Sequence, residues 1–472
     1  MKIRIIIVGI MICCATFVDA QGTKLTLQKA IDTALKNNIT TRQSELLMHN
    51  AEVTYTQAKN NRLPQVQGGY DYGFNRGRSI DPFTNGYINQ KLTSSSVNAQ
   101  GSLPVFSGFL LKNSIRQNEF AFATATMQWQ QSKDELTLQV ILAYLQILNN
   151  EDALVLAKQQ ADISKQQVDR LIIIEKEGAT PPANLSDLKG QYAGDELGII
   201  AAENNLSSSV LSLTQLMYVP YNAGMEIDRM GFDSTIKMYA SMPDEIYAIA
   251  LQKLASVKAS ELRIKASDMG IKVASAAFYP TVSLFGQVST NFSSAASLSK
   301  ILSTSEIPSG DFVTYNNSNI PVITHQNNIS NQKIGYGTQL NNNLARAYGV
   351  SINIPLFNSF RYRSNVKLAK NEAKNSQLIA DNIKFQLRQA VDQAFVNITT
   401  TYKRYMVLQE QSAAYAESFR IAAIRFENGV INSPEYLIAK NNLDRTNATI
   451  ITTRYEYLLR EKVLDFYMGK LN

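Results

Sequence analysis

The chain has 472 residues, of which 45% are hydrophobic and 18% are charged, and its formal net charge is +7. This length suits two or three ordinary domains, or one domain built from repeats. Lys and Arg are spread along the chain instead of gathering in one run, which argues against a nucleic-acid partner. The two cysteines, Cys13 and Cys14, are adjacent near the start. The rest of the chain therefore offers no disulfide, thiolate nucleophile or Cys-ligated metal.

Residues 1–20 have the features of a secretory signal peptide. Lys2 and Arg4 precede the apolar run IIIVGIMICCATF, and Val18 and Ala20 occupy the positions of a cleavage site. The apolar run is too short for a transmembrane helix, which needs about 20 residues. We expect cleavage after Ala20 and export of the rest of the chain. Lipidation of either cysteine stays open, although neither follows the small residue that a bacterial lipidation site prefers.

The next elements expected along the chain are a helix, a strand, a loop and a second strand. In PQVQGGYDYGF the side chains of Val66, Tyr70, Tyr72 and Phe74 share one face of the first strand. The segment SVNAQGSLP alternates apolar and polar residues in the same way. Alternation over about ten residues is typical of strands in a membrane β-barrel. A soluble sandwich alternates too, but the strands here have no second sheet to bury against.

A very long helix is expected after each pair of strands. Residues 109–177 and 356–428 contain no Gly or Pro and are rich in Ala, Leu, Gln, Lys and Glu. At a rise of about 1.5 Å per residue, each helix is about 100 Å long, far longer than a globular domain is wide. Apolar residues such as Leu136, Val140 and Ala143 recur at helical spacing. Such helices must associate as a coiled-coil array or a tube.

The sequence repeats itself. Pro104 in GSLPVFSGF and Pro355 in INIPLFNSF are 251 positions apart, and so are Gly178 and Gly429. Nearer the start of each half, Pro64 and Pro280 match at an offset of 216. The second half therefore carries 35 extra residues between Pro280 and Pro355. Internal repeats of this kind indicate that one structural unit occurs twice.

The repeat sets the expected domain boundaries. The two repeats cover residues 23–218 and 243–470, and residues 219–242 form a linker between them. The second repeat contains the strands PTVSLFGQVS and YGVSINIP, separated by a long loop at 291–345 that is rich in Asn and Ser. Long polar loops at one rim and helices at the other suit a membrane barrel with distinct outer and inner sides.

The tandem halves, the two strand-to-helix segments and the Gly-marked helix turns resemble the outer-membrane efflux protein family, the TolC-like channels. The resemblance implies an α+β membrane protein that forms a homotrimer. Each chain is expected to give four strands to one 12-stranded β-barrel in outer-membrane lipid, continuous with a long α-helical coiled-coil barrel in the periplasm. It also implies a periplasmic adaptor and an inner-membrane pump of the RND or ABC type as partners. The channel is expected to conduct passively from the periplasm to the outside.

The strand-to-helix junctions are expected at Pro104 and Phe106 and, in the second half, at Pro355 and Phe357. A proline lacks the N–H that a strand ladder needs, and it presets φ for the start of a helix. We therefore expect each proline to end its strand and open the helix that follows.

The two helix turns are the expected docking region for the adaptor, as the resemblance implies. They contain Gly178, Pro181, Pro182, Gly429, Ser433 and Pro434. Family members with an acidic gate place acids six and nine positions after the second glycine. Glu435 fits this pattern, whereas Ile438 does not. Glu435 and Asp187 are therefore candidates for an acidic constriction, and the alternative is an ordinary helix start with first-turn acids.

Several other features have less specific explanations. Tyr70, Tyr72, Phe74 and Tyr348 suit either an interfacial aromatic girdle or packing at a subunit seam. Trp129 is expected to pack between helices. The two histidines have no metal-ligand spacing, and no nucleotide-binding, hydrolase or zinc-protease motif occurs, so we expect no enzyme, cofactor or metal site.

A second function remains possible from the sequence. A secreted coiled-coil structural or adhesion protein of the periplasm, without a pore, shares the long helices. The alternating strands argue against it, and fractionation distinguishes outer-membrane trimers from a soluble rod.

Overall fold

The computed structural model describes residues 24–80, 85–89, 91–178, 181–229 and 236–470, so the expected signal peptide and both cysteines lie outside the described residues. The chain forms two compact units, each built from separated stretches of sequence. Among the described residues, the helical unit takes those within 24–52, 120–265 and 374–470, and the sheet unit takes those within 53–119 and 266–373.

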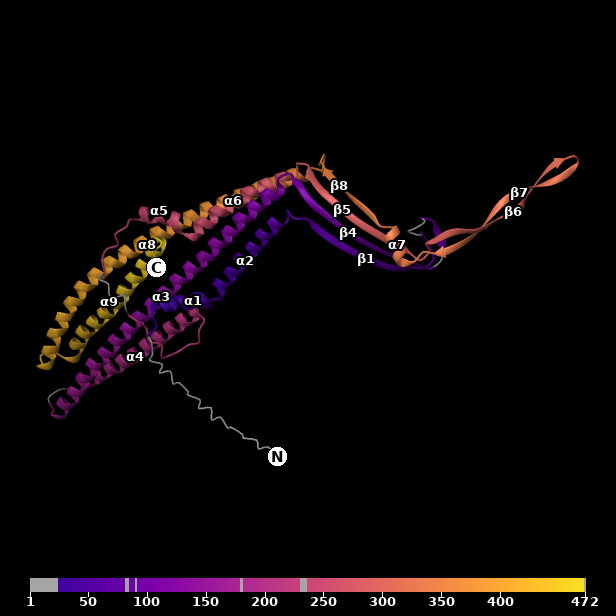
Figure 1. Cartoon of the computed structure of the whole chain (residues 1–472). Coiled ribbons are helices and arrows are strands. Elements are labelled where there is room, and N and C mark those ends of the chain that lie inside the picture. The colour runs from indigo at the N-terminus through magenta and orange to yellow at the C-terminus, as the bar shows by residue number, and fades with distance from the viewer. Residues whose placement is uncertain (1–23, 81–84, 90, 179–180, 230–235, 471–472) are drawn as a thin grey trace, which may run out of the picture. The chain divides into compact units, whose positions relative to one another are not determined.

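The helices of the structure come in similar lengths from the two halves of the sequence (Figure 1). Both segments without Gly or Pro are helical, which confirms this prediction, although the second helix begins at Arg361 rather than near Leu356. The helices are α1 (Leu27–Asn37), α2 (Ile39–Asn60), α3 (Leu110–Lys176), α4 (Pro182–Met217), α5 (Pro243–Lys253), α6 (Ala255–Ala276), α7 (Tyr336–Asn342), α8 (Arg361–Glu427) and α9 (Ser433–Tyr467).

The helical unit is held by apolar clusters between neighbouring helices. Helices α3 and α4 lie side by side, as do α8 and α9 (Figure 1). Tyr144 of α3 is fully buried, and its hydroxyl lies 2.7 Å from the carbonyl oxygen of Leu25 and 2.5 Å from that of Asp228. One side chain thereby fastens the N-terminal segment and the inter-repeat segment to α3. A window of α3 is apolar enough to cross a membrane by composition, but core helices have this property too. Buried residues of α3 that belong to the core include Leu136, Val140 and Leu148.

Two asparagines where α1 meets α2 also cap the C-terminal end of α4. The side-chain amides of Asn37 and Asn38 donate to the carbonyl oxygens of Met217 and Leu216, each at 3.3 Å. These carbonyls belong to the last turn of α4, where no intrahelical donor remains. The Asn38 side-chain oxygen accepts from the N–H of Thr40 at 2.9 Å, as an N-cap of α2 does. One asparagine thus caps two helices that meet end to end.

The sheet unit contains the four predicted strands in one antiparallel sheet, in the order β1-β4-β5-β8. Two further hairpins, β2-β3 and β6-β7, form two-stranded sheets of their own. The strands are β1 (Gln65–Asn75), β2 (Arg78–Ile80), β3 (Tyr87–Asn89), β4 (Leu92–Ser107), β5 (Thr281–Ser293), β6 (Ser297–Tyr315), β7 (Ser318–Lys333) and β8 (Ala345–Asn353).

The segment 291–345, expected as a polar loop, is instead mostly a hairpin followed by α7. Polar side chains bond across it, as between Ser299 and Asn331 at 2.7 Å and between Thr304 and Asn327 at 2.8 Å. Asn316 and Asn317 turn the chain with φ of 50° and 64°, as a two-residue hairpin turn requires. Asn and Ser have low strand propensity, so the composition concealed this pairing.

The junction prolines do not begin the long helices. Pro104 lies inside β4, at a bulge against β5, and the strand continues to Ser107. Pro355 follows β8, and each helix begins six residues after its proline. The expectation that the prolines open the helices is therefore wrong, because another device makes this turn.

Two consecutive residues in the left-handed region make the turn at each junction. Gly108 and Phe109 have φ of 61° and 66°, and Ser359 and Phe360 have φ of 55° and 60°. Aromatic rings meet edge to face at both places, with Phe106 5.4 Å from Phe109 and Phe357 5.6 Å from Phe360 between ring centroids. A Cβ at Gly108 would lie 2.6 Å from the Ala276 carbonyl oxygen, so only glycine fits there.

Candidate functional site: a two-faced sheet and paired helix turns

One face of the four-stranded sheet is apolar and open. The strand register places alternate residues of all four strands on this face, and their side chains are largely exposed, with Tyr348 at 90% and Val66 at 77%. Exposed apolar area this large is unusual on a soluble protein. The larger apolar members of the face are Val66, Tyr70, Tyr72, Phe74, Val97, Leu284, Val288, Tyr348, Val350 and Ile352. The same face also carries the exposed Arg346, opposite Val288 near the start of β8.

The opposite face of the same sheet is polar. It presents Gln67, Asn98, Gln100 and Ser351 from alternate positions, together with the aromatic exception Phe285. A cavity of about 490 Å³ lies among the glutamines of β1, β4 and β5. Among the described residues, β1 and β8 pair along one edge only. The sheet therefore has an apolar side, a polar side and two edges with unpaired backbone groups.

The first helix turn joins α3 to α4. Gly178 has φ of 71°, which glycine tolerates better than other residues. A Cβ added at Gly178 would have no neighbouring atom within 4 Å. Pro181 stands in the cap position of α4, and Pro182 is its first residue. A proline suits this place because the first helical N–H groups have no intrahelical acceptor.

The second helix turn joins α8 to α9 and has a different cap. Gly429 has φ of 69°. Asn432 is the N-cap, and its side-chain oxygen accepts from the backbone N–H of Glu435 at 3.2 Å. Pro434 lies in the first turn, next to Ser433. The backbone of Glu435 therefore takes part in an ordinary helix cap. Its carboxylate is exposed and remains available for another role.

Ser433 connects the two turns. Its side chain is fully buried, and its hydroxyl lies 2.6 Å from a carboxylate oxygen of Asp187 and 3.0 Å from the side-chain oxygen of Asn184. A hydroxyl carries one proton and so donates to one of these oxygens at a time. Sequence reasoning placed Ser433 and Asp187 at the turns but did not pair them, because they lie 246 positions apart.

An aromatic cluster lies beneath this contact. The rings of Phe426 and Tyr436 stack with centroids 4.8 Å apart, and Leu185 and Leu188 of α4 belong to the same buried cluster. Burial raises the pKa of Tyr436 to about 12, with further contributions from the charges of Asp444, Glu427 and Asp195. The turns of the two helix pairs therefore share one small core.

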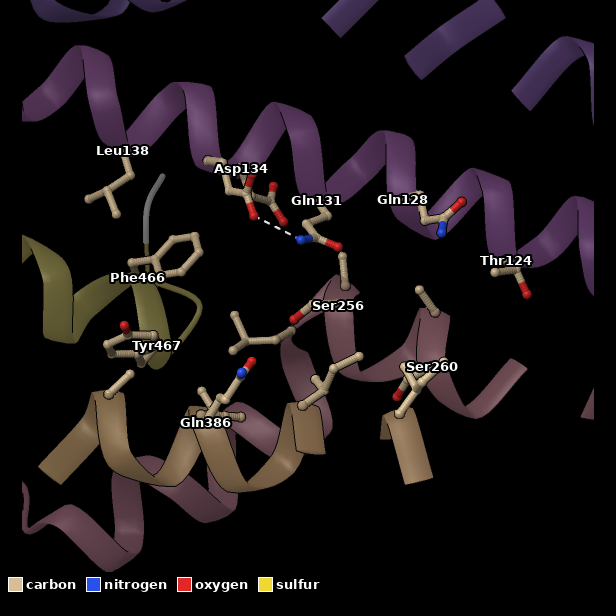
Figure 2. Close-up of a pocket in the computed structure, with 18 of the residues that line it drawn as sticks. Thr124, Gln128, Gln131, Asp134, Leu138, Ser256, Ser260, Gln386, Phe466 and Tyr467 are labelled. Atoms are coloured by element: carbon tan, nitrogen blue, oxygen red, sulfur yellow. Dashed lines mark hydrogen bonds between the residues drawn. The ribbon is translucent and has the colours of Figure 1, made fainter. Parts of the chain in front are cut away.

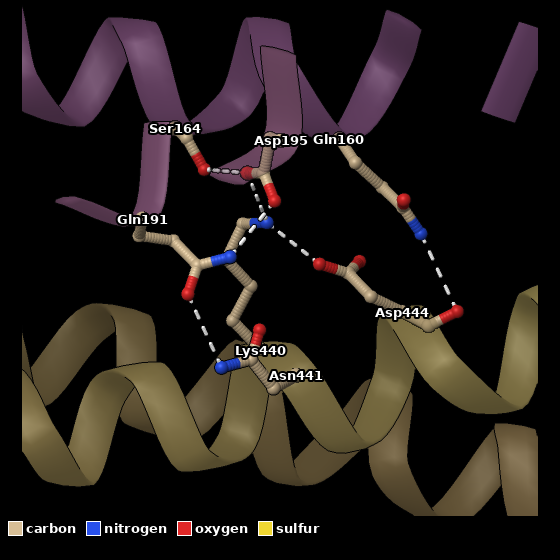
Figure 3. Close-up of polar contacts among 7 residues, drawn as sticks. All are labelled: Gln160, Ser164, Gln191, Asp195, Lys440, Asn441 and Asp444. Carbon is tan, nitrogen blue, oxygen red and sulfur yellow. Dashed lines mark hydrogen bonds and ion pairs between the residues drawn. The ribbon is translucent and has the colours of Figure 1, made fainter. Parts of the chain in front are cut away.

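A buried lysine joins the helix pairs further along (Figure 3). Lys440 of α9 is 1% exposed, and its Nζ lies 3.0 Å from Asp195 of α4 and 2.6 Å from Asp444 of α9. Ser164 of α3 and Gln191 of α4 donate to the two carboxylate oxygens of Asp195, at 2.5 and 2.8 Å. Three helices thus meet in one satisfied polar network.

Sequence reasoning missed this network. The only local signal is that Lys440 and Asp444 are four positions apart, a spacing common to exposed helix pairs. Burial raises the pKa of Asp444 and outweighs the opposing effect of Lys440, which bonds to the same carboxylate. The partner carboxylate of Asp195 comes from the other half of the chain, so its presence could not be inferred from spacing.

The candidate acids do not meet within one chain. Within the described residues, no hydrogen bond or ion pair joins Glu435 to Asp187. Ile438, at the position where an acid is missing, is 63% exposed. The residues of the turns therefore lie as expected at the two helix ends, and an acidic constriction remains a prediction.

An open apolar face with a polar reverse, in one chain with helices of 67 residues, is typical of an outer-membrane channel whose helices lie in the periplasm. The sequence matches the family described as outer membrane efflux protein over residues 30–217 and 246–470, and the chain belongs to this family. Its members are channels, and the chain accordingly serves as an exit duct in the outer membrane.

Individual relatives are similar over nearly the whole chain. The "Probable outer membrane lipoprotein SilC" of Salmonella typhimurium is 24% identical, covering 96% of this chain and 86% of its own length. The outer membrane protein TolC of Escherichia coli (strain K12) is 21% identical, covering 88% and 76%. The crystal structure of the outer membrane protein VceC of Vibrio cholerae superposes with a TM-score of 0.74 at 13% identity, covering 94% and 96%. This last similarity shows a shared fold.

Proposed function

We propose that three copies of the chain close their sheets into one 12-stranded barrel and so form the exit duct of a tripartite efflux or type I secretion system. The open apolar face of the sheet supports this most directly. Lipid does not hydrogen-bond to a free strand edge, so β1 and β8 must pair with other strands. Pairing β8 of one copy with β1 of the next closes both edges and turns the apolar faces toward lipid.

The helical part extends the duct toward an inner-membrane partner in this proposal. The two helix turns, from Gly178 to Pro182 and from Gly429 to Pro434, dock a periplasmic adaptor. The adaptor in turn engages an inner-membrane pump of the RND or ABC type, which supplies the energy of transport. A secreted rod without a pore is less consistent, because it gains nothing from an open apolar sheet face.

The paired elements support two tandem repeats at 23–218 and 243–470, with 219–242 as the linker. Helices α1 and α5 each have 11 residues, α2 and α6 each have 22, and α3 and α8 each have 67. The junctions at Phe106 and Phe357 share their ring geometry. The hairpin β6-β7 accounts for most of the extra length in the second repeat.

Neighbouring residues of β8 test the barrel. Val350→Lys places a charge on the apolar face, which costs about 2–4 kcal/mol at the middle of a membrane. We expect this variant to lose most of its outer-membrane trimer, measured by fractionation and heat-modifiable mobility in gels. Ser351→Lys is the matched control, since it points to the polar face and should assemble normally. Equal assembly of both variants would contradict a lipid-facing apolar side.

Glu435 is proposed to form an acidic constriction, one carboxylate per copy, with Asp187 nearby. A ring of carboxylates favours cations and excludes anions. We expect Glu435→Ala to raise single-channel conductance in planar bilayers and to weaken block by divalent cations. Glu410→Ala, an exposed acid on α8 away from the turn, is the control. Unchanged conductance and block in Glu435→Ala would remove this residue from the gate.

A further inference from the structure

A cavity of about 510 Å³ lies within the helical unit, between α3 and α8 (Figure 2). Its floor is the first two turns of α6, where Ala255, Ser256, Ala259 and Ser260 have short side chains. These residues do not fill the space between the two long helices. The volume falls in the range of sites for small organic molecules.

One end of the cavity is apolar and aromatic. Phe466 and Tyr467, from the last turn of α9, line it with their rings edge to face and 5.5 Å apart between centroids. Leu138 of α3 and Leu387 of α8 complete this end. In Figure 2 the ring of Phe466 lies between Leu138 and Asp134.

Two carboxylates of α3 line the same space. Asp134 accepts from the side-chain amide of Gln130 at 2.7 Å, and Glu135 accepts from Gln131 at 2.8 Å. Amides satisfy hydrogen bonds but do not neutralise charge. Neither carboxylate forms an ion pair with another described residue, and burial raises the pKa of Asp134.

The basic residues nearby offset part of this negative charge, since Lys133 lowers the pKa of Asp134 while burial raises it. Lys133 of α3 directly precedes Asp134, but its ammonium lies over the ring of Trp129, 3.9 Å from the centroid. Arg263 lines the far end of the cavity, seven residues beyond Ser256 and so about 10 Å further along α6. Lys253 and Lys258 border an adjoining cavity that Asp134 and Phe466 also line.

We propose that this cavity binds lipophilic organic cations, with the carboxylate of Asp134 beside the charge and the rings of Phe466 and Tyr467 against the apolar body. Aromatic faces attract organic cations, and the attraction grows where water is excluded. The residues that line the cavity include none of the helix-turn residues, so the proposal does not depend on the adaptor docking or the acidic constriction proposed above.

Tetraphenylphosphonium and tetraphenylborate test the proposal, because they share a shape and differ in the sign of their charge. Binding to the purified full-length protein is measured by equilibrium dialysis against detergent-matched buffer. We expect the phosphonium ion to bind above the detergent background and the borate ion to bind at least about tenfold more weakly. Equal binding of the two ions, or no phosphonium binding above background, would overturn the proposal.

Two substitutions locate the site. Asp134→Asn keeps the shape of the side chain and should weaken phosphonium binding about fivefold or more. Phe466→Leu should weaken binding of both ions, with assembly checked by gel mobility. The matched control is Asp162→Asn, an exposed acid of α3 that accepts from Gln166 at 2.8 Å but does not line the cavity. Wild-type binding in Asp134→Asn would refute the assignment.

Discussion

At the scale of single residues, two connections between the halves of the chain are polar and buried. Ser433 bonds to residues of α4 across the turns, and Lys440 holds the carboxylate of Asp195 from the other helix pair. A buried charge is stable only while its partners remain in place. The helix pairs therefore cannot separate at this level without exposing or stranding Lys440.

Replacing Lys440 by Met tests this connection. The variant leaves Asp195 and Asp444 partly buried without their cation, and we expect a loss of about 3 kcal/mol in the free energy of unfolding. Urea unfolding followed by circular dichroism at 222 nm measures the loss. Lys158→Met, which removes an exposed ion pair with Glu203, should cost less than about 1 kcal/mol.

A double substitution separates the charge effect from simple packing. Adding Asp195→Asn to Lys440→Met removes one unpaired carboxylate and should restore part of the lost stability. If Lys440→Met and Lys158→Met are equally stable, the network contributes little to holding the helix pairs together.

Residue-level prediction from sequence succeeded where the signal is local. Glycines mark both turns, and the predicted helix start at Ser433-Pro434-Glu435 is present, although its cap is Asn432, which was not among the candidate residues. The Ser433–Asp187 contact and the Lys440 network depend on side chains from opposite halves. A single sequence carries no measure of such distances, so these contacts were out of its reach.

At the scale of elements, the junction from strand to helix is the clearest correction. The repeated prolines drew attention to the right segment, but the chain turns at the pairs Gly108-Phe109 and Ser359-Phe360. Left-handed φ at Phe109, Ser359 and Phe360 is uncommon for residues with a Cβ and is not visible in propensity. The strands and long helices were predictable because alternation and the absence of Gly and Pro are local signals.

Gly108→Ala tests the junction. An alanine at this position would have to adopt the left-handed φ of Gly108. Its Cβ would also lie 2.6 Å from atoms of Ala276 and Tyr279. We expect a clear loss of assembled protein and a lower thermal midpoint. The control Gly178→Ala has φ of 71° but open space, so it carries the strain of about 1–2 kcal/mol without the clash. Equal effects of the two substitutions would show that the close contacts at Gly108 relax freely.

At the scale of the whole molecule, association between copies follows from the sheet. The open edges of β1 and β8 and the open apolar face need partners that one chain lacks within the described residues. Four strands could be counted from the sequence, and the need for more than one copy follows from that count. The register between copies could not be predicted, because nothing within one chain specifies it.

Cysteine cross-linking tests the association. Both native cysteines lie in the expected signal peptide, so introduced pairs should be the sole thiols of the exported chain. We expect Gln67→Cys in β1, combined in turn with cysteine at Ala347, Gly349 or Ser351 in β8, to give disulfide-linked oligomers in at least one combination.

A cross-strand pair within one chain provides the control. Gln67 faces Gln100 in the register of β1 and β4, so cysteines at these two positions should link without a change in mass. Monomers alone in every β1–β8 combination, with the Gln67–Gln100 link intact, would contradict a barrel shared between copies.

The hairpin β6-β7 has a consequence for how the protein can vary. It forms a sheet of its own, and the N–H of Ile334 bonds to the carbonyl oxygen of Ala296 at its base, 3.2 Å away. Because its strands pair with each other, mutations there leave the register of the four-stranded sheet unchanged. This segment is therefore free to diversify between strains of a bacterium. Its turn at Asn316 and Asn317 is a natural position for inserting an epitope or a fluorescent label.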